Sequence, residues 1–169
     1  MMNKKIQDAI NDQIQAEFQS AYIYLAMSAH FAERNLNGFA HWLQLQWQEE
    51  IEHAMKFYHF ILRRGGSVEL KTIDKPEIEL TNPLQIFEAV LQHEQYITSR
   101  INDLYALAVE EKDYAFQTLL HWFIDEQVEE EENATDIIEK LKLIGDSGQA
   151  LFLLDRELGE RAPEAESNE

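Results

Sequence analysis

The sequence is short of the residues that cross-link chains or interrupt helices: it has no cysteine, three prolines and six glycines among 169 residues. Without cysteine the chain cannot form disulfides, thiolate zinc sites or cysteine-bound iron–sulfur clusters. Because proline and glycine are scarce, long uninterrupted helices are possible, and hydrophobic residues at 45% are sufficient for a core. These features favour a single, mostly helical globular domain over a disordered chain.

Positive charge and long apolar runs are also scarce. Lysine and arginine number 14 against 32 aspartates and glutamates, which gives a formal net charge of −18. So acidic a chain should repel nucleic acid and anionic membranes and attract cations. No apolar run approaches the ~20 residues that span a bilayer, and the opening MMNKKIQDA lacks the apolar core of a signal peptide. We therefore expect a soluble, cytoplasmic protein with no nucleic-acid or membrane partner.

Apolar residues recur at helical spacing in four long segments. Gly65-Gly66 is a strong terminator for the second segment, and Pro83 suits the first turn of the third. A short fifth helix is expected at about 149–158, followed by a charged, disordered tail at residues 159–169. The four long helices are expected at about 6–33, 39–64, 83–111 and 114–144.

The connection between the second and third helices, about Ser67 to Asn82, shows no sustained helical period. An extended chain of about 16 residues reaches ~50 Å, whereas a helix of about 26 residues is ~39 Å long. The connection can therefore run the full length of a bundle, while the other links are short and join antiparallel neighbours. The predicted fold is all-α, a four-helix bundle with one long crossover connection and a short C-terminal fifth helix. The alternative is a functional loop at one end of an up-down bundle.

Each of the four apolar stripes is interrupted near the middle of its helix by polar side chains. A carboxylate that is buried without a partner is strongly unfavourable or becomes protonated, so one such interruption in every stripe is hard to explain as an accident. Mid-helix positions share one layer whichever way each helix runs, and these side chains should converge there. They are Glu17, Glu50 with His53, Glu94, and Gln127 with Glu130.

The converging carboxylates need positive charge, and no lysine or arginine occupies the stripes near their depth. Glu50 and His53, at i and i+3, lie on one face of a helix. Carboxylate oxygens with one imidazole nitrogen suit iron or manganese better than copper. Four carboxylates match the charge of two divalent ions that lie ~3.5–4 Å apart. The pattern predicts a dinuclear metal site, and a structural bundle without metal is the alternative.

The chain resembles the prokaryotic non-haem ferritins over about residues 3–158. The resemblance implies a ferritin-like di-iron domain at residues 1–158, with residues 159–169 as the tail. It also implies an iron-storage subunit that oxidises Fe(II) with oxygen or hydrogen peroxide and stores ferric oxo-hydroxide mineral in a cage of twenty-four copies. The matching pieces are Glu17 with Tyr24, the segment Glu49-Glu50-Ile51-Glu52-His53, Glu94, and Trp122 to Glu130 with Gln127-x-x-Glu130.

The same resemblance implies a ferroxidase centre within each subunit. Glu17, Glu50 and His53 are similar to the ligands of one iron. Glu50, Glu94 and Glu130 are similar to the ligands of the other iron, with Glu50 as the bridge. The short fifth helix would lie near the four-fold axes of the cage.

Further residues receive roles from the resemblance. Gln127 would lie close to the irons, and Tyr24 would form a hydrogen bond to the site and supply an electron. Glu49, Glu126 and Glu129 each precede a central position by one residue and point about 100° around the helix from it. With Glu130 they resemble a third iron site, and a solvated acidic face is the alternative.

Departures from related families narrow the prediction. Bacterioferritins carry a second Glu-x-x-His on the fourth helix and a haem-ligating methionine after the bridging glutamate. This chain has Gln127-x-x-Glu130 and Ile51 at those places, so we expect no haem. Rubrerythrins add a cysteine-bound iron module that this chain cannot form. The alternative function is a di-iron oxidase or oxygenase that acts on an organic substrate.

Overall fold

The computed structural model describes residues 2–79 and 81–163. Over these residues the chain forms five helices and no strand. The predicted all-α fold is confirmed, and each expected helix boundary lies within two residues of the observed one. The division of the chain at residue 158 stays a prediction, because residues 164–169 of the expected tail lie outside the described residues. The helices are α1 (Lys4–Ala32), α2 (Asn37–Arg63), α3 (Pro83–Glu110), α4 (Tyr114–Ile144) and α5 (Gly148–Leu158).

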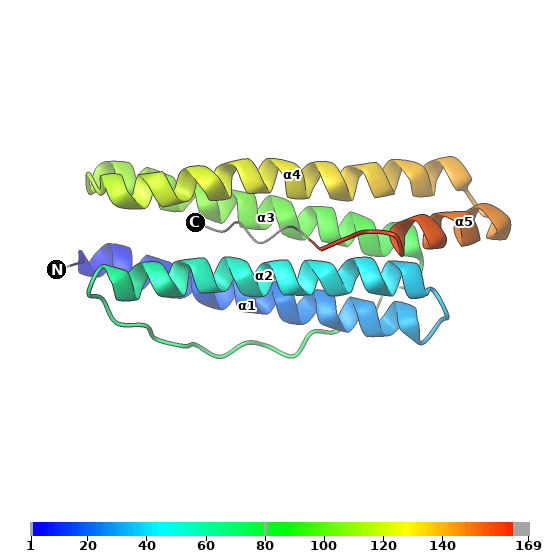
Figure 1. The fold of residues 1–169 in the computed structure, drawn as a ribbon, viewed down its shortest axis with the longest axis horizontal. Helices are drawn as coiled ribbons and strands as arrows, with labels where there is room; N and C mark the ends of the chain where they lie inside the picture. The colour runs from blue at the N-terminus through cyan, green and yellow to red at the C-terminus, as the bar shows by residue number, and fades with distance from the viewer. Residues whose placement is uncertain (1, 80, 164–169) are drawn as a thin grey trace.

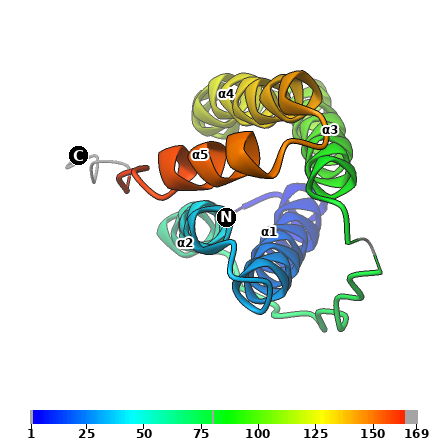
Figure 2. The same cartoon turned by 90° about the vertical axis from the view of Figure 1, so that its right-hand side faces the viewer.

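The four long helices lie lengthwise in a bundle, and α5 packs against α2 and α4 at one end (Figures 1 and 2). Helices α1 and α2 form one antiparallel pair, and α3 and α4 form the other. Residues 64–79 leave the end of α2 and run back along the outside of the bundle toward the end where α3 begins (Figure 1). The connection is therefore the long crossover that its length predicts.

Side-chain amides of α1 hold this extended connection in place. Asn11 Nδ2 donates to the backbone oxygen of Ser67 at 3.0 Å, and Gln19 Nε2 donates to that of Asp74 at 3.1 Å. Residues four apart lie on one face of a helix, so a row of amides can replace the strand partner that the connection lacks. The row consists of Gln7, Asn11, Gln15 and Gln19.

The start of α2 is capped by another helix. Its own N-cap residue, Leu36, makes no side-chain cap. Instead, Asp155 of α5 accepts hydrogen bonds at Oδ1 from the backbone nitrogens of Gly38 at 2.8 Å and Phe39 at 3.1 Å. A Cβ atom at Gly38 would lie 1.5 Å from the backbone oxygen of Asp155, so only glycine permits this approach. The other helices begin at side-chain caps on Asn3, Asn82, Asp113 and Ser147.

The apolar core consists of two clusters toward opposite ends of the bundle. One contains the stacked rings of Phe31 and Phe39, with centroids 5.0 Å apart. The other contains Phe57 and Phe123, with centroids 4.1 Å apart. Over the described residues, each helix is either too short or too polar to traverse a lipid bilayer. The two clusters leave a polar layer between them at mid-bundle.

Candidate metal centre

Polar side chains from all four long helices occupy the layer between the two apolar clusters. Glu17, Glu50 and Glu94 are each 1% exposed, and Glu130 is 3% exposed. His53 is 2% exposed. On every long helix these positions fall between residues of one cluster and residues of the other. We call this set the central layer: Glu17, Glu50, His53, Glu94, Gln127 and Glu130.

Two groups of ligand atoms lie close enough together to hold a metal ion. Glu17, Glu50 and His53 each offer an atom within 4.8 Å of the others, and so do His53, Glu126 and Glu130. The first group is the set expected for one iron. The second differs from expectation, because it takes in Glu126 and leaves out Glu94. Carboxylate oxygens with a shared imidazole form a donor set that fits iron or manganese.

Glu94 belongs to neither group, and its oxygens accept hydrogen bonds from two protein donors. The Tyr24 hydroxyl donates to Oε1, and Gln127 Nε2 donates to Oε2 at 3.2 Å. Burial raises the pKa of Glu94 to about 7, although the hydrogen bonds from Tyr24 and Gln127 oppose that rise. Burial and the charges of Glu94 and Glu50 raise the pKa of Tyr24 well above its usual range. Tyr24 therefore stays protonated and serves as a donor.

The remaining ionisable groups of the central layer are also strongly perturbed. Burial raises the pKa of Glu50 well above its usual range, and the charge of Glu94 adds to the rise while His53 opposes it. Burial likewise raises the pKa of Glu130, with a further contribution from Glu94. Burial lowers the pKa of His53, but the charge of Glu50 and hydrogen bonds to Glu126 and Glu50 raise it well above its usual value.

A proton or another cation therefore has to offset the charge of the central layer. His53 Nδ1 lies 3.3 Å from Glu50 Oε2, and His53 Nε2 lies 3.6 Å from Glu126 Oε1. In the part of the chain that the structure describes, no lysine or arginine forms an ion pair with the four central carboxylates.

Two glutamines that sequence reasoning missed support the carboxylates. Gln13 Nε2 donates to Glu17 Oε1 at 2.8 Å, and Gln46 Nε2 donates to Glu130 Oε2 at 2.7 Å. Both glutamines are fully buried. Gln13 lies one helical turn before Glu17, and Gln46 lies one turn before Glu50. A second polar residue at i−4 in each apolar stripe was the sequence signal that could have predicted these glutamines. Glu17 Oε2 is buried without a hydrogen-bond partner among the described residues, as a carboxylate oxygen that faces a metal position would be.

The flanking acids, Glu49, Glu126 and Glu129, have three different environments. Glu126 is buried and contacts His53, as described above. Glu129 is exposed. Glu49 is 5% exposed, and both of its carboxylate oxygens accept hydrogen bonds from Arg161. The structure thus places Glu49 and Glu126 in buried positions and leaves Glu129 in solvent.

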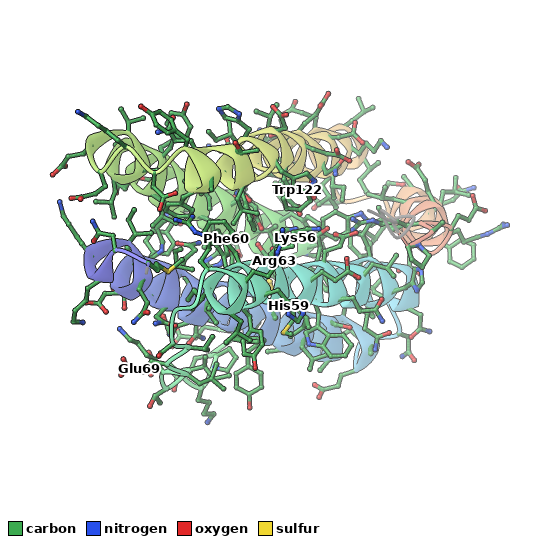
Figure 3. The ribbon with its side chains drawn as sticks, turned by 60° about the vertical axis from the view of Figure 1, so that its left-hand side comes forward. Lys56, His59, Phe60, Arg63, Glu69 and Trp122 are labelled. Atoms are coloured by element: carbon green, nitrogen blue, oxygen red, sulfur yellow. The ribbon has the colours of Figure 1, made fainter. Side chains whose placement is uncertain are left out.

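Trp122 connects the central layer to the surface between α2 and α4. Its ring meets that of His53 edge-on, with centroids 5.5 Å apart. The ammonium group of Lys56 lies over the Trp122 ring, 4.3 Å from its centroid. Figure 3 shows Lys56 reaching from α2 toward Trp122 on α4. Together these side chains close the side of the central layer next to His53.

Residues 7–144 match the ferritin-like domain. The chain belongs to the ferritin family. It is 42% identical to the bacterial non-heme ferritin of Bacteroides fragilis over 95% of this chain and 100% of the relative. It is 38% identical to the bacterial non-heme ferritin of Staphylococcus aureus over 95% of this chain and 97% of the relative. An open-pore ferritin from the hyperthermophilic archaeon Archaeoglobus fulgidus superposes with a TM-score of 0.94 at 46% identity, over 96% of this chain and 99% of that one. The family resemblance that the sequence suggests is therefore confirmed.

Proposed function

We propose that this ferritin is an iron-storage subunit that oxidises Fe(II) at the central layer and stores the product as a ferric oxo-hydroxide mineral. One observation carries the proposal. Four carboxylates, one from each long helix, are buried at one depth with a single histidine and without a lysine or arginine partner in the described chain. That arrangement is costly for a structural protein and is suited to two divalent cations.

In this proposal Glu17, Glu50 and His53 bind one ferrous ion, and Glu50, Glu94 and Glu130 bind the other. Each ferrous ion loses one electron. Dioxygen accepts the two electrons with two protons to give hydrogen peroxide, or hydrogen peroxide accepts them with two protons to give two water molecules. Hard carboxylate oxygens favour the more highly charged ferric product.

Iron binding must displace protons from the central layer. The pKa values of Glu50, Glu94 and Glu130 are all raised in the metal-free protein. Because metal ions bind the carboxylate form, each ion that enters competes with protons and releases them. Glu94 accepts hydrogen bonds from Tyr24 and Gln127, so these two donors lie beside a ligand of the second ion.

Mineral storage requires many copies, because one chain cannot enclose a mineral core. Because the chain is similar to ferritins over nearly its whole length, we propose a homo-oligomeric cage of twenty-four subunits and a cytoplasmic location. Apolar side chains on α5 are available for such contacts: Phe152 is 61% exposed and Leu153 is 57% exposed. Closed symmetric assembly would bury these side chains between copies.

An aerobic ferrous iron titration of the metal-free protein, followed by absorbance and gel filtration, tests this function. We expect rapid oxidation that saturates near about two irons per chain, then slower loading into a shell-sized particle. A monomer or dimer that oxidises iron but forms no mineral would contradict storage. That result would favour a di-iron enzyme with an organic substrate.

A further inference from the structure

The segment that follows α5, residues 159–163, is fastened along α2. His41 Nε2 donates to the backbone oxygen of Arg161 at 2.8 Å, and Arg161 Nη1 donates to that of Trp42 at 3.3 Å. The guanidinium of Arg161 also lies over the indole of Trp42, 4.5 Å from the ring centroid. Asp155, which lies earlier in the chain on α5, caps the start of α2. Through these contacts, the end of α5 and the segment after it run alongside α2 from its first turn toward its middle.

Arg161 also forms an ion pair with Glu49, one of the flanking acids. Its Nη2 donates to Glu49 Oε1 at 2.9 Å and to Glu49 Oε2 at 2.8 Å. The side chain of Glu49 is 7% exposed and that of Arg161 is 18% exposed, so water screens this ion pair only partly. Charge-assisted hydrogen bonds of this length are among the strong ones. Both oxygens that Glu49 could offer a metal ion therefore face a cation that belongs to the protein.

Glu49 is electrostatically part of the acid-rich region next to the central layer. It precedes Glu50 in the chain, and its negative charge is one of the causes that raise the pKa of Glu130. Glu126, the other buried flanking acid, lies 3.6 Å from His53. A third metal ion bound by Glu49, Glu126 and Glu130 would therefore compete with the Arg161 guanidinium for the carboxylate of Glu49.

We infer that Arg161 is a built-in counter-cation for Glu49, and that a third metal ion must displace Arg161 before Glu49 can bind the ion. This inference rests on the proposed function, because it concerns a metal site beside the proposed oxidation centre. The two central ions would bind first, since none of their ligands is held by Arg161. Occupation of the third site would free Arg161 and loosen the segment at residues 159–163 from α2. Arg161 thereby sets the order of metal loading and couples the third site to the C-terminal segment.

Zinc, which is not oxidised, separates this inference from ferroxidase activity. Metal-free wild-type protein and the Arg161→Gln variant are dialysed to equilibrium against zinc, and bound zinc is counted per chain. We expect two tight sites in both proteins and a third site whose affinity rises about 10- to 100-fold in Arg161→Gln. Arg156→Gln is the matched control, because it removes the same charge from an exposed position on α5. Its third-site affinity should stay within about threefold of wild type.

Hydrogen-exchange mass spectrometry of the C-terminal peptide gives a second readout that does not depend on affinity. In wild type, the backbone amides of residues 159–162 should exchange faster once the third zinc binds. In Arg161→Gln they should exchange quickly even without zinc.

Two results overturn the inference while leaving the proposed function intact. In the first result, both variants keep two tight zinc sites, but the third site of Arg161→Gln binds zinc no more tightly than that of Arg156→Gln. The other is a C-terminal segment whose exchange does not respond to zinc. If the isotherm of wild type matches that of Glu50→Ala at every site, the proposed function itself fails, and this inference fails with it.

Discussion

The central layer and the flanking acids lie side by side, yet they compensate negative charge in different ways. Central carboxylates such as Glu50 lie between the two apolar clusters, and among the described residues their partners are His53 and neutral donors. Among the flanking acids, Glu49 has an arginine and Glu129 has solvent. The difference indicates which acids are prepared for a metal ion: the buried acids that the protein leaves without a permanent cation. Acidic composition alone does not make that distinction.

The largest effect is expected when the ligands at the middle of the central layer are removed. The double variant Glu50→Ala with His53→Ala should slow ferrous iron oxidation by at least roughly 100-fold, because each ion loses ligands that contribute several kcal/mol. Stopped-flow absorbance measures the rate, and gel filtration checks that assembly is unchanged. The control is Glu52→Ala with His59→Ala, which removes an exposed acid and histidine from the same helix. Oxidation at the wild-type rate in the double variant would refute the site assignment.

The pH dependence of stability gives a second contrast between the regions. The folded pKa of Glu94 is about 7, above the ordinary value of 4.5. A carboxyl with a raised folded pKa stabilises the fold fully below its unfolded pKa, and that contribution is lost as the pH rises through about 7. Metal-free protein should therefore lose about 3 kcal/mol of stability from Glu94 between about pH 5 and pH 8. The raised pKa values of Glu50 and Glu130 act in the same direction.

Thermal unfolding of metal-free protein over that pH range measures the effect. Glu94→Gln should flatten the profile, since its amide does not titrate and can still accept a hydrogen bond from Tyr24. Glu129→Gln, at an exposed flanking acid, should leave the profile as it is in wild type. A wild-type melting temperature that increases steadily from pH 5 to pH 8 would show that the central carboxyls are not protonated in the folded protein.

Loosening the C-terminal segment should have a smaller effect. Asp155→Ala removes the cap on the backbone nitrogens of Gly38 and Phe39. Loss of a helix cap typically costs about 0.5–2 kcal/mol, so we expect a lower melting temperature and a modestly stronger third zinc site. Calorimetry and zinc dialysis measure the two quantities. Asp155→Asn retains an oxygen acceptor and should lie between wild type and Asp155→Ala; equal effects of the two would argue against the cap.

The smallest effect is expected at the hydroxyl that contacts Glu94. Tyr24→Phe removes one hydrogen bond to a carboxylate and leaves the packing of the ring unchanged. We expect the single-turnover oxidation rate to fall by less than roughly 30-fold, as one charge-assisted hydrogen bond is lost. Tyr22→Phe, on an exposed position of the same helix, should oxidise iron at the wild-type rate. If Tyr24→Phe also kept that rate, Tyr24 would be an ordinary core residue.

Local patterns in the sequence were sufficient to predict the fold and the central layer. Helical spacing with Gly65 and Pro83 as breaks located the helices, and the depth of Glu17 and Glu94 along theirs indicated one shared layer. These signals are local, because period and position along a helix can be read from a single segment. The length of the connection favoured a crossover over a loop at one end of the bundle, and the structure decides between the two (Figure 1).

Two contacts that the sequence did not predict join distant parts of the chain. Gln46 reaches Glu130, and Arg161 reaches Glu49 across 112 positions. No spacing rule relates residues on different helices, so such partners become apparent only when the helices are packed. Sequence reasoning assigned Arg161 no role because it falls in the segment that was expected to be disordered, where charged neighbours and Pro163 are typical of solvated chain ends.

Iron bound in the central layer is what the proposed function most directly requires. Crystals of the metal-free protein soaked in ferrous iron without oxygen can be measured on either side of the iron absorption edge. We predict two anomalous peaks per chain about 3.5–4 Å apart, one beside Glu17 and His53 and one beside Glu94 and Glu130, with Glu50 between them. Peaks only at the exposed acids, with the central layer empty, would contradict it.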